Sequence, residues 1–85
     1  MEELYTFKVK TREDFIKFLN LLLKDYYEDP ASWENKPLPE FLRAMGAFSE
    51  SMQGYYNNTK QNVDADEPNW GTFADMFRAA KVYEA

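Results

Sequence analysis

The sequence predicts an all-α domain, a compact bundle of three main helices, from three observations. Apolar residues recur at steps of three and four in three separate stretches, which is the spacing of a helix with one apolar face. Polar or proline-containing connectors separate these stretches. The length of 85 residues is that of one domain, so we expect residues 1–85 to fold as a single unit.

The first ten residues follow a different spacing, because Tyr5, Phe7 and Val9 alternate with polar residues. A period of two is typical of extended backbone. The sequence offers no second strand-like run to pair with it. We therefore expect an extended N-terminal arm held along the helices by its apolar side chains. The alternative is that this segment pairs with the edge of a partner's sheet.

The first main helix is expected at about residues 12–27. Thr11 suits its N-cap because a threonine hydroxyl accepts a hydrogen bond from a free first-turn amide, and Glu13 and Asp14 place negative charge where the helix dipole favours it. The predicted apolar face is broad, and such a face is typical of a helix buried on two sides. It comprises Phe15, Phe18 or Leu19, Leu22 and Tyr26, widened by Ile16 and Leu23.

A connector with two prolines follows at residues 28–38, and we expect one short helical turn in it at about 32–35. Trp33 in this connector has two interpretations. It is a lid over the seam between the first and second helices, or it is an anchor in an interface with a partner.

The second main helix is expected at about residues 39–56 and begins with Pro39, which lacks an amide hydrogen and so suits a first turn. Its apolar stripe places Tyr55 mostly in the core and leaves Tyr56 mostly exposed, the alternative for Tyr56 being packing on Trp70. The stripe is Phe41, Met45, Phe48, Met52 and Tyr55.

A polar loop at residues 57–68 precedes the last main helix, which is expected at about 70–84. Its composition predicts a mobile surface loop. Asn69 is the predicted N-cap of the last helix, with Thr72 as a second candidate. We expect three charged residues of that helix to lie in water: Asp75, Arg78 and Lys81.

The chain lacks histidine and cysteine, and with them the commonest general base, the commonest zinc ligands and the thiolate nucleophile. It has no glycine-rich phosphate loop, and Asp64-x-Asp66 lacks the glycine and the distal glutamate of a calcium loop. We therefore expect no catalytic residue, no metal site and no cofactor. The sequence does not predict an enzyme.

The net charge of −5 is concentrated in residues 25–85, which hold eleven acidic and five basic residues. This balance disfavours nucleic-acid binding and suits a basic protein partner. The alternative is that the acidic surface serves solubility alone. The sequence has no apolar run near the ~20 residues that span a membrane. Its charged start lacks a signal-peptide apolar region, so we expect a cytoplasmic protein.

The most partner-like residues lie near the end of the second helix and in the acidic loop. Tyrosine gives broad, rigid contact area and is enriched at binding hot spots, and carboxylates around it select a partner rich in lysine and arginine. The candidate partner-binding residues are Glu50, Tyr55, Tyr56, Asp64, Asp66 and Glu67.

Several stretches together resemble a small family of functionally uncharacterised bacterial proteins, which implies one intact domain and no established activity. They are W-E-N at 33–35, G-Y-Y-x-N at 54–58 and W-x-x-F-A…A-A-x-x-Y-E at 70–84. A looser likeness is to the immunity proteins of nuclease bacteriocins, small acidic helical bundles that bind a basic nuclease through acidic groups and a tyrosine pair.

Two functions follow from these observations. The first is a small acidic protein-binding module, immunity-like in that it neutralises a basic partner. The second is a structural or regulatory helical domain whose apolar faces form a homo-oligomer, suggested by the high Phe, Leu and Met content.

Overall fold

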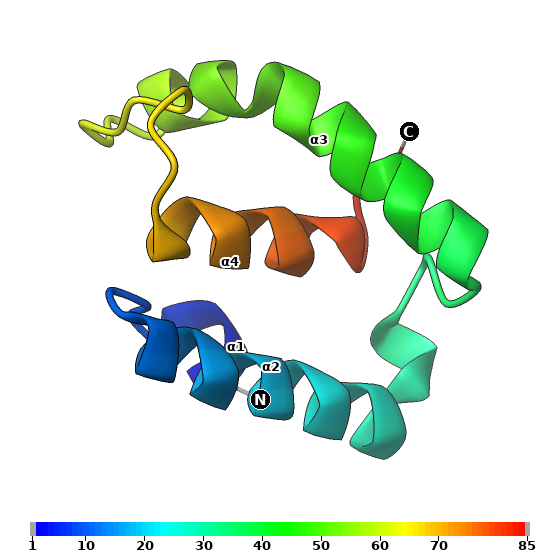
Figure 1. Ribbon diagram of the computed structural model, residues 1–85. Helices are drawn as coiled ribbons and strands as arrows, with labels where there is room; N and C mark the ends of the chain where they lie inside the picture. Colours follow the sequence, from blue (N-terminus) through cyan, green and yellow to red (C-terminus); the bar gives the residue numbers. More distant parts are fainter. Residues whose placement is uncertain (1, 85) are drawn as a thin grey trace.

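The computed structural model describes residues 2–84, which form four α-helices and one 3-10 turn (Figure 1). No strand occurs within this range, so the predicted all-α bundle is confirmed. The first two main helices match their expected bounds within two residues, and the last one ends at Ala80 instead of residue 84. The elements are α1 (Glu2–Thr6), α2 (Arg12–Glu28), η1 (Pro30–Ser32), α3 (Leu38–Asn58) and α4 (Trp70–Ala80).

Helix α4 lies between α2 and α3, and α1 packs beside α2 (Figure 1). Small buried residues of α4, Ala74 and Ala80, allow its neighbours to approach closely. One core cluster joins α1, α2, Trp33 and α4, and a second joins α3 and α4 around Phe48 and Met52. In the part of the chain that the structure describes, none of the helices combines the length and apolar character needed to cross a membrane.

Both predicted N-caps are confirmed. The Thr11 hydroxyl accepts from the Asp14 amide at 3.1 Å, and the Asp14 carboxylate accepts from the Thr11 amide in return. The Asp14 carboxylate also accepts from the Lys10 amide at 3.0 Å. This bond first, and then the bonds with Thr11, lower the pKa of Asp14. At α4, Asn69 Oδ1 accepts from the Thr72 amide at 2.8 Å, so Thr72 is the reciprocal partner rather than the cap.

The prediction of an extended N-terminal arm is wrong for residues Glu2–Thr6, which form α1. A side chain from the other end of the chain stabilises this short helix, since Arg78 Nε donates to the Leu4 carbonyl at 2.7 Å. Leu4 is 1% exposed and Val9 is 8% exposed, so apolar residues do anchor the segment.

Trp33 is buried, which confirms the lid interpretation. Its ring centroid lies 5.2 Å from that of Tyr26 in α2 and 5.9 Å from that of Phe41 in α3. The short turn precedes it at Pro30–Ser32 instead of 32–35.

The broad apolar face predicted for α2 is only partly buried, although α1 and α4 both pack against this helix. Phe18 and Leu22 face the core, whereas Ile16 is 52% exposed and Leu23 is 54% exposed. The reason is the position of α4, which covers one face of α2, while the connector through η1 carries α3 to the far side of α4 (Figure 1).

Candidate functional site

Tyr55, near the end of α3, has its side chain at the surface and 44% exposed. Its ring centroid lies 5.6 Å from that of Phe48 and 5.4 Å from that of Tyr56. Edge-on and tilted aromatic contacts of this kind orient a ring without covering it. Tyr55 is therefore an exposed aromatic held in place by buried ones.

Three hollows of about 610, 540 and 360 Å³ border Tyr55. Tyr5 from α1 lines the first and third, and Val82, which follows α4, lines the second and third. Tyr5 is 53% exposed and Val82 is 42% exposed. We call the surface made by Tyr5, Tyr55, Val82 and these hollows the Tyr55 face. Exposed apolar side chains gathered around concave surface are typical of protein-contact sites.

Tyr56 is completely buried, so the prediction that it is mostly exposed is wrong. Its hydroxyl donates to Asp75 Oδ2 of α4 at 2.6 Å. Burial, and then this hydrogen bond, raises the pKa of Tyr56. The buried stripe of α3 runs through Phe48, Met52 and Tyr56 at steps of four, so Tyr55 lies beside the stripe and not in it.

The prediction that Asp75, Arg78 and Lys81 lie in water is wrong. Asp75 also accepts from Arg78 Nη1 at 2.8 Å, and Arg78 donates to the backbone carbonyls of Leu4 in α1 and of Phe7 just after it. Lys81 is only 3% exposed. Asp75 and Arg78 both line the hollow of about 610 Å³, so its lining includes a satisfied ion pair at the junction of three helices.

A side chain of α3 holds the acidic loop through two hydrogen bonds. Gln53 Nε2 donates to the Val63 carbonyl at 2.9 Å, and Gln53 Oε1 accepts from the Ala65 amide at 2.8 Å. The predicted contact residues Glu50, Asp64, Asp66 and Glu67 are all exposed. None of these four carboxylates lines the hollows at Tyr55; among the described residues, Asp75 is the acid that lines two of them.

A buried polar cluster joins α2, the η1 connector and the end of α4, and sequence reasoning missed it. Asp25 Oδ2 accepts from Trp33 Nε1 and from Lys81 Nζ, each at 2.8 Å. Lys81 Nζ also donates to the Tyr5 hydroxyl at 2.8 Å. Burial opposes the charged form of Lys81, but the hydrogen bonds to Asp25 and Tyr5 outweigh it, so the pKa of Lys81 is raised.

A signal for this cluster was present in the sequence. Asp25 lies three residues after Leu22, in register with the core face of α2. An ionised carboxylate in that position requires a buried cation or donors. The cluster links Tyr5 of the Tyr55 face to the core.

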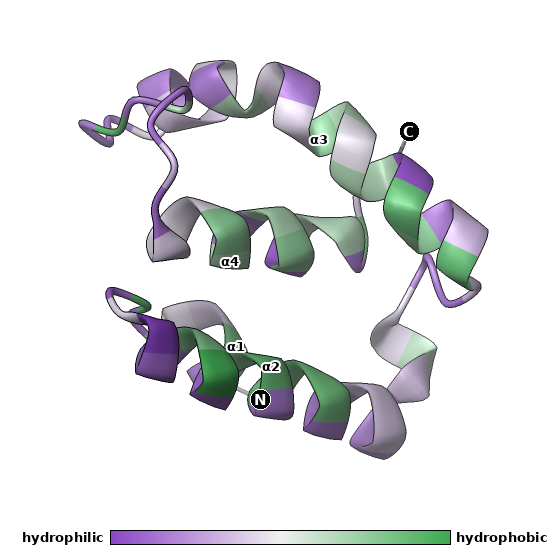
Figure 2. Cartoon of the chain, in the orientation of Figure 1, coloured by the Kyte–Doolittle hydropathy of each residue, from purple (hydrophilic) through white to green (hydrophobic). Residues whose placement is uncertain are grey.

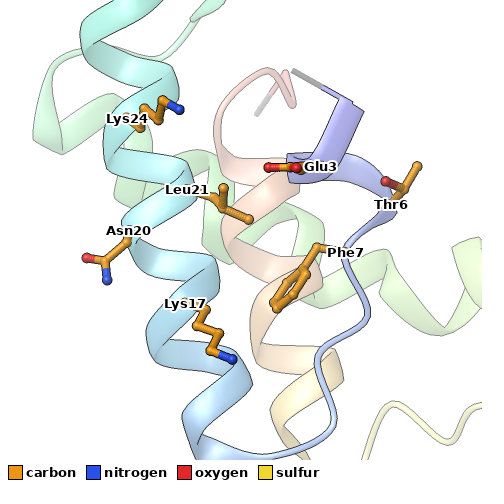
Figure 3. Close-up of a pocket in the computed structure, with 7 residues that line it drawn as sticks. All are labelled: Glu3, Thr6, Phe7, Lys17, Asn20, Leu21 and Lys24. Carbon is orange, nitrogen blue, oxygen red and sulfur yellow. The ribbon is translucent and has the colours of Figure 1, made fainter.

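A separate hollow of about 510 Å³ lies between α1 and α2 (Figure 3). Figure 3 shows Leu21 of α2 and Phe7 extending into the space between the two segments, with Lys17 and Lys24 along α2. Within residues 2–84 no group of three or more histidine, cysteine, aspartate or glutamate residues is arranged to hold a metal ion.

The model of one protein family, described as Family of unknown function (DUF7660), matches residues 11–84. The chain belongs to this family. The match confirms the resemblance to a small uncharacterised family, and it leaves α1 outside the matched range. Neither the curated proteins nor the solved structures include a match to the chain.

In this member of the family, the W-E-N motif has a clear structural role at the end of α4. Trp33 bonds Asp25, and Asn35 Nδ2 donates to the carbonyls of Ala80 and Tyr83 at 2.9 Å each. The backbone amides of residues 34 and 35 both donate to the Lys81 carbonyl. The connector therefore satisfies the carbonyls left free where α4 ends.

Proposed function

We propose that this family member is a small acidic protein-binding module that takes a basic protein partner on the Tyr55 face. The observation that supports this is the exposure of Tyr55, at 44%, in the middle of three hollows. A rigid aromatic flanked by concave surface provides an anchor and adjoining recesses for a partner's side chains.

The charge of the chain favours a basic partner. The net charge of −5 attracts a cationic protein over long range and speeds its encounter. At contact, the exposed ring of Tyr55 suits cation–π pairing with arginine or lysine. We assign the exposed carboxylates of Glu50 and of the loop to an acidic rim of the contact, since none of them lines the hollows.

The finer form of this proposal is an immunity-like inhibitor that binds a basic, nuclease-like toxin with one-to-one stoichiometry in the cytoplasm. It rests on the small acidic helical fold and on an exposed tyrosine at a helix end. Tyr56 acts from beneath, because its bond to Asp75 fixes the helix end that presents Tyr55.

The test is capture of a partner by the immobilised chain and by two matched tyrosine variants. The bait is offered a native-cell extract and the purified products of neighbouring genes, and retained proteins are eluted with rising NaCl. We expect a basic protein to be retained by wild type and by Tyr27→Ala, which removes a 73% exposed tyrosine from α2. Tyr55→Ala should lose it.

The rim is tested separately by the triple variant Asp64→Asn, Asp66→Asn, Glu67→Gln. Rim charges act mainly on the association rate, so this variant should associate more slowly and show a weaker salt dependence. If a folded Tyr55→Ala chain binds the same partner as tightly as Tyr27→Ala does, the Tyr55 face is not the contact surface.

A further inference from the structure

An unpartnered apolar line runs along α2 on the side away from the core. It consists of Ile16, Leu19, Leu23 and Tyr27, at steps of three, four and four, which keeps side chains on one side of a helix. Their exposed fractions are 52%, 36%, 54% and 73%. We call this line the α2 seam. Repeats of this spacing are typical of helices that pair with another helix.

A groove adjoins the seam where α2 and α3 diverge. Its volume is about 270 Å³, and its walls include Leu19 and Leu23 from α2 and Leu38 and Phe41 from α3. That volume is at or below the lower limit of small-molecule pockets, but it fits side chains that project from a helix. Figure 2 shows hydrophobic bands along α2 and again near the start of α3.

The apolar area matches what a homodimer uses. Leu38 is 65% exposed and Leu42 is 55% exposed, so with the seam six large side chains are about half exposed. At roughly 150–200 Å² for a fully exposed large side chain, they present on the order of 500 Å². A standard interface takes about 800 Å² from each partner, of which about 65% is apolar in homodimers.

The charges at the two ends of α2 are self-complementary. Arg12 lies four residues before Ile16, on the seam side of the first turn, whereas Glu28 and Asp29 end the helix. All three are exposed, and the described residues provide no ion-pair partner for any of them. When two copies of α2 run antiparallel, Arg12 of each copy meets the acidic end of the other.

We infer that a second copy of this chain docks on the α2 seam, forming a two-fold dimer in which the seam of each copy enters the groove of the other. A two-fold interface uses the same patch on both copies, so the patch must be self-complementary. The patch on α2 is self-complementary, because it has a ridge beside a groove and opposite charges at its two ends. The dimer leaves the Tyr55 face free.

The first test is the mass of the full chain in solution, measured by light scattering and by sedimentation from micromolar to millimolar concentration. Wild type should reach twice the 10.1 kDa chain mass. Leu23→Asp should weaken dimerisation at least 100-fold. Val82→Asp, a matched change at a 42% exposed apolar residue on the Tyr55 face, should leave the dimer intact.

The second test uses charge exchange to identify the antiparallel arrangement. Arg12→Glu and Glu28→Arg should each weaken the dimer about 3- to 10-fold, and the double variant should restore it. Each single change places a charge that the α2 dipole favours, so a weaker dimer cannot be attributed to loss of the helix. Circular dichroism checks that every variant is folded.

Each alternative outcome overturns the inference. A wild-type chain that stays monomeric up to millimolar concentration has no self-docking seam, and a helix of another protein is then its occupant. A dimer that survives Leu23→Asp but not Val82→Asp uses the Tyr55 face. If the double variant Arg12→Glu, Glu28→Arg fails to restore dimerisation, the two α2 helices are not antiparallel in the dimer.

Discussion

Replacing Lys81 with methionine tests whether the buried polar cluster holds α2, the connector and α4 together. The side chains of Lys81 and Asp25 are 4% and 2% exposed, and their charged atoms lie 2.8 Å apart. Methionine keeps most of the length of lysine and removes the ammonium. The Asp25 carboxylate then retains Trp33 Nε1 as its donor and loses its counter-charge.

The expected loss is large relative to the stability of the domain. Leaving one member of a buried ion pair uncompensated costs about 3–5 kcal/mol. A chain of 85 residues has roughly 4–13 kcal/mol of unfolding free energy at about 0.05–0.15 kcal/mol per residue. Lys81→Met should therefore lower the melting temperature by about 12 °C or more. Lys24→Met, at an exposed lysine of α2, is the control and should change stability by less than about 0.5 kcal/mol.

Urea unfolding followed by far-UV circular dichroism measures both effects, and a double-mutant cycle with Asp25→Leu isolates the pair. The double variant removes both members of the buried ion pair, so it should be more stable than Lys81→Met alone, although the Trp33 indole N–H loses its acceptor. The reasoning is refuted if Lys81→Met unfolds at the same urea concentration as Lys24→Met.

Three further predictions concern pH and the helix ends. The pKa values of Tyr56 and Lys81 in the folded protein are raised above their ordinary 10.0 and 10.5, so both protonated groups stabilise the folded state. This stabilisation is complete at a pH below the ordinary pKa values, and it is lost as the pH rises through the folded-state pKa values. Urea midpoints should thus fall above about pH 10, and less steeply in Tyr56→Phe. Asn35→Ala removes two hydrogen bonds to carbonyls at the end of α4 and should lower the unfolding free energy by about 2 kcal/mol, measured by urea unfolding; an unchanged midpoint would show that water replaces them. Asn69→Ala removes the α4 cap and should cost about 1 kcal/mol in the same assay, whereas Asn62→Ala in the loop should cost nothing measurable.

The helices and their starts were predictable because their determinants are local. The spacing of apolar residues gave α2, α3 and α4, and the capping residues Thr11 and Asn69 lie next to the turns they cap. The N-terminal helix was not predictable in this way, because the donor that stabilises its end is Arg78 from α4.

The exposure of Tyr55 and Tyr56 could not be settled from spacing. Neighbouring residues in a helix point about 100° apart, so a stripe of alternating threes and fours and a stripe of fours end on different tyrosines. Tyr56 is the buried one of the two, because its hydroxyl donates to Asp75 on α4. The register of Asp25 with Leu22 indicated its burial, but spacing could not identify its cation, because Lys81 comes just after α4.

The free seam of α2 was not predictable, since periodicity shows that a face is apolar and not whether anything covers it. Ile16 and Leu23 match the pattern of a core residue as well as Phe18 does. The path of α4 between α2 and α3 determines which of them is covered (Figure 1).

The bonds between α4 and the first residues of the chain constrain when the domain can fold during synthesis. Arg78 and Lys81 bond residues 71 to 76 positions earlier in the sequence. Contacts this distant require the intervening chain to close into one large loop, which slows folding. On the ribosome, α1 and the apolar side of α2 must wait for α4 to emerge. A nascent chain that lacks α4 exposes Phe18 and Leu22, and it is during this interval that a chaperone has a surface to bind.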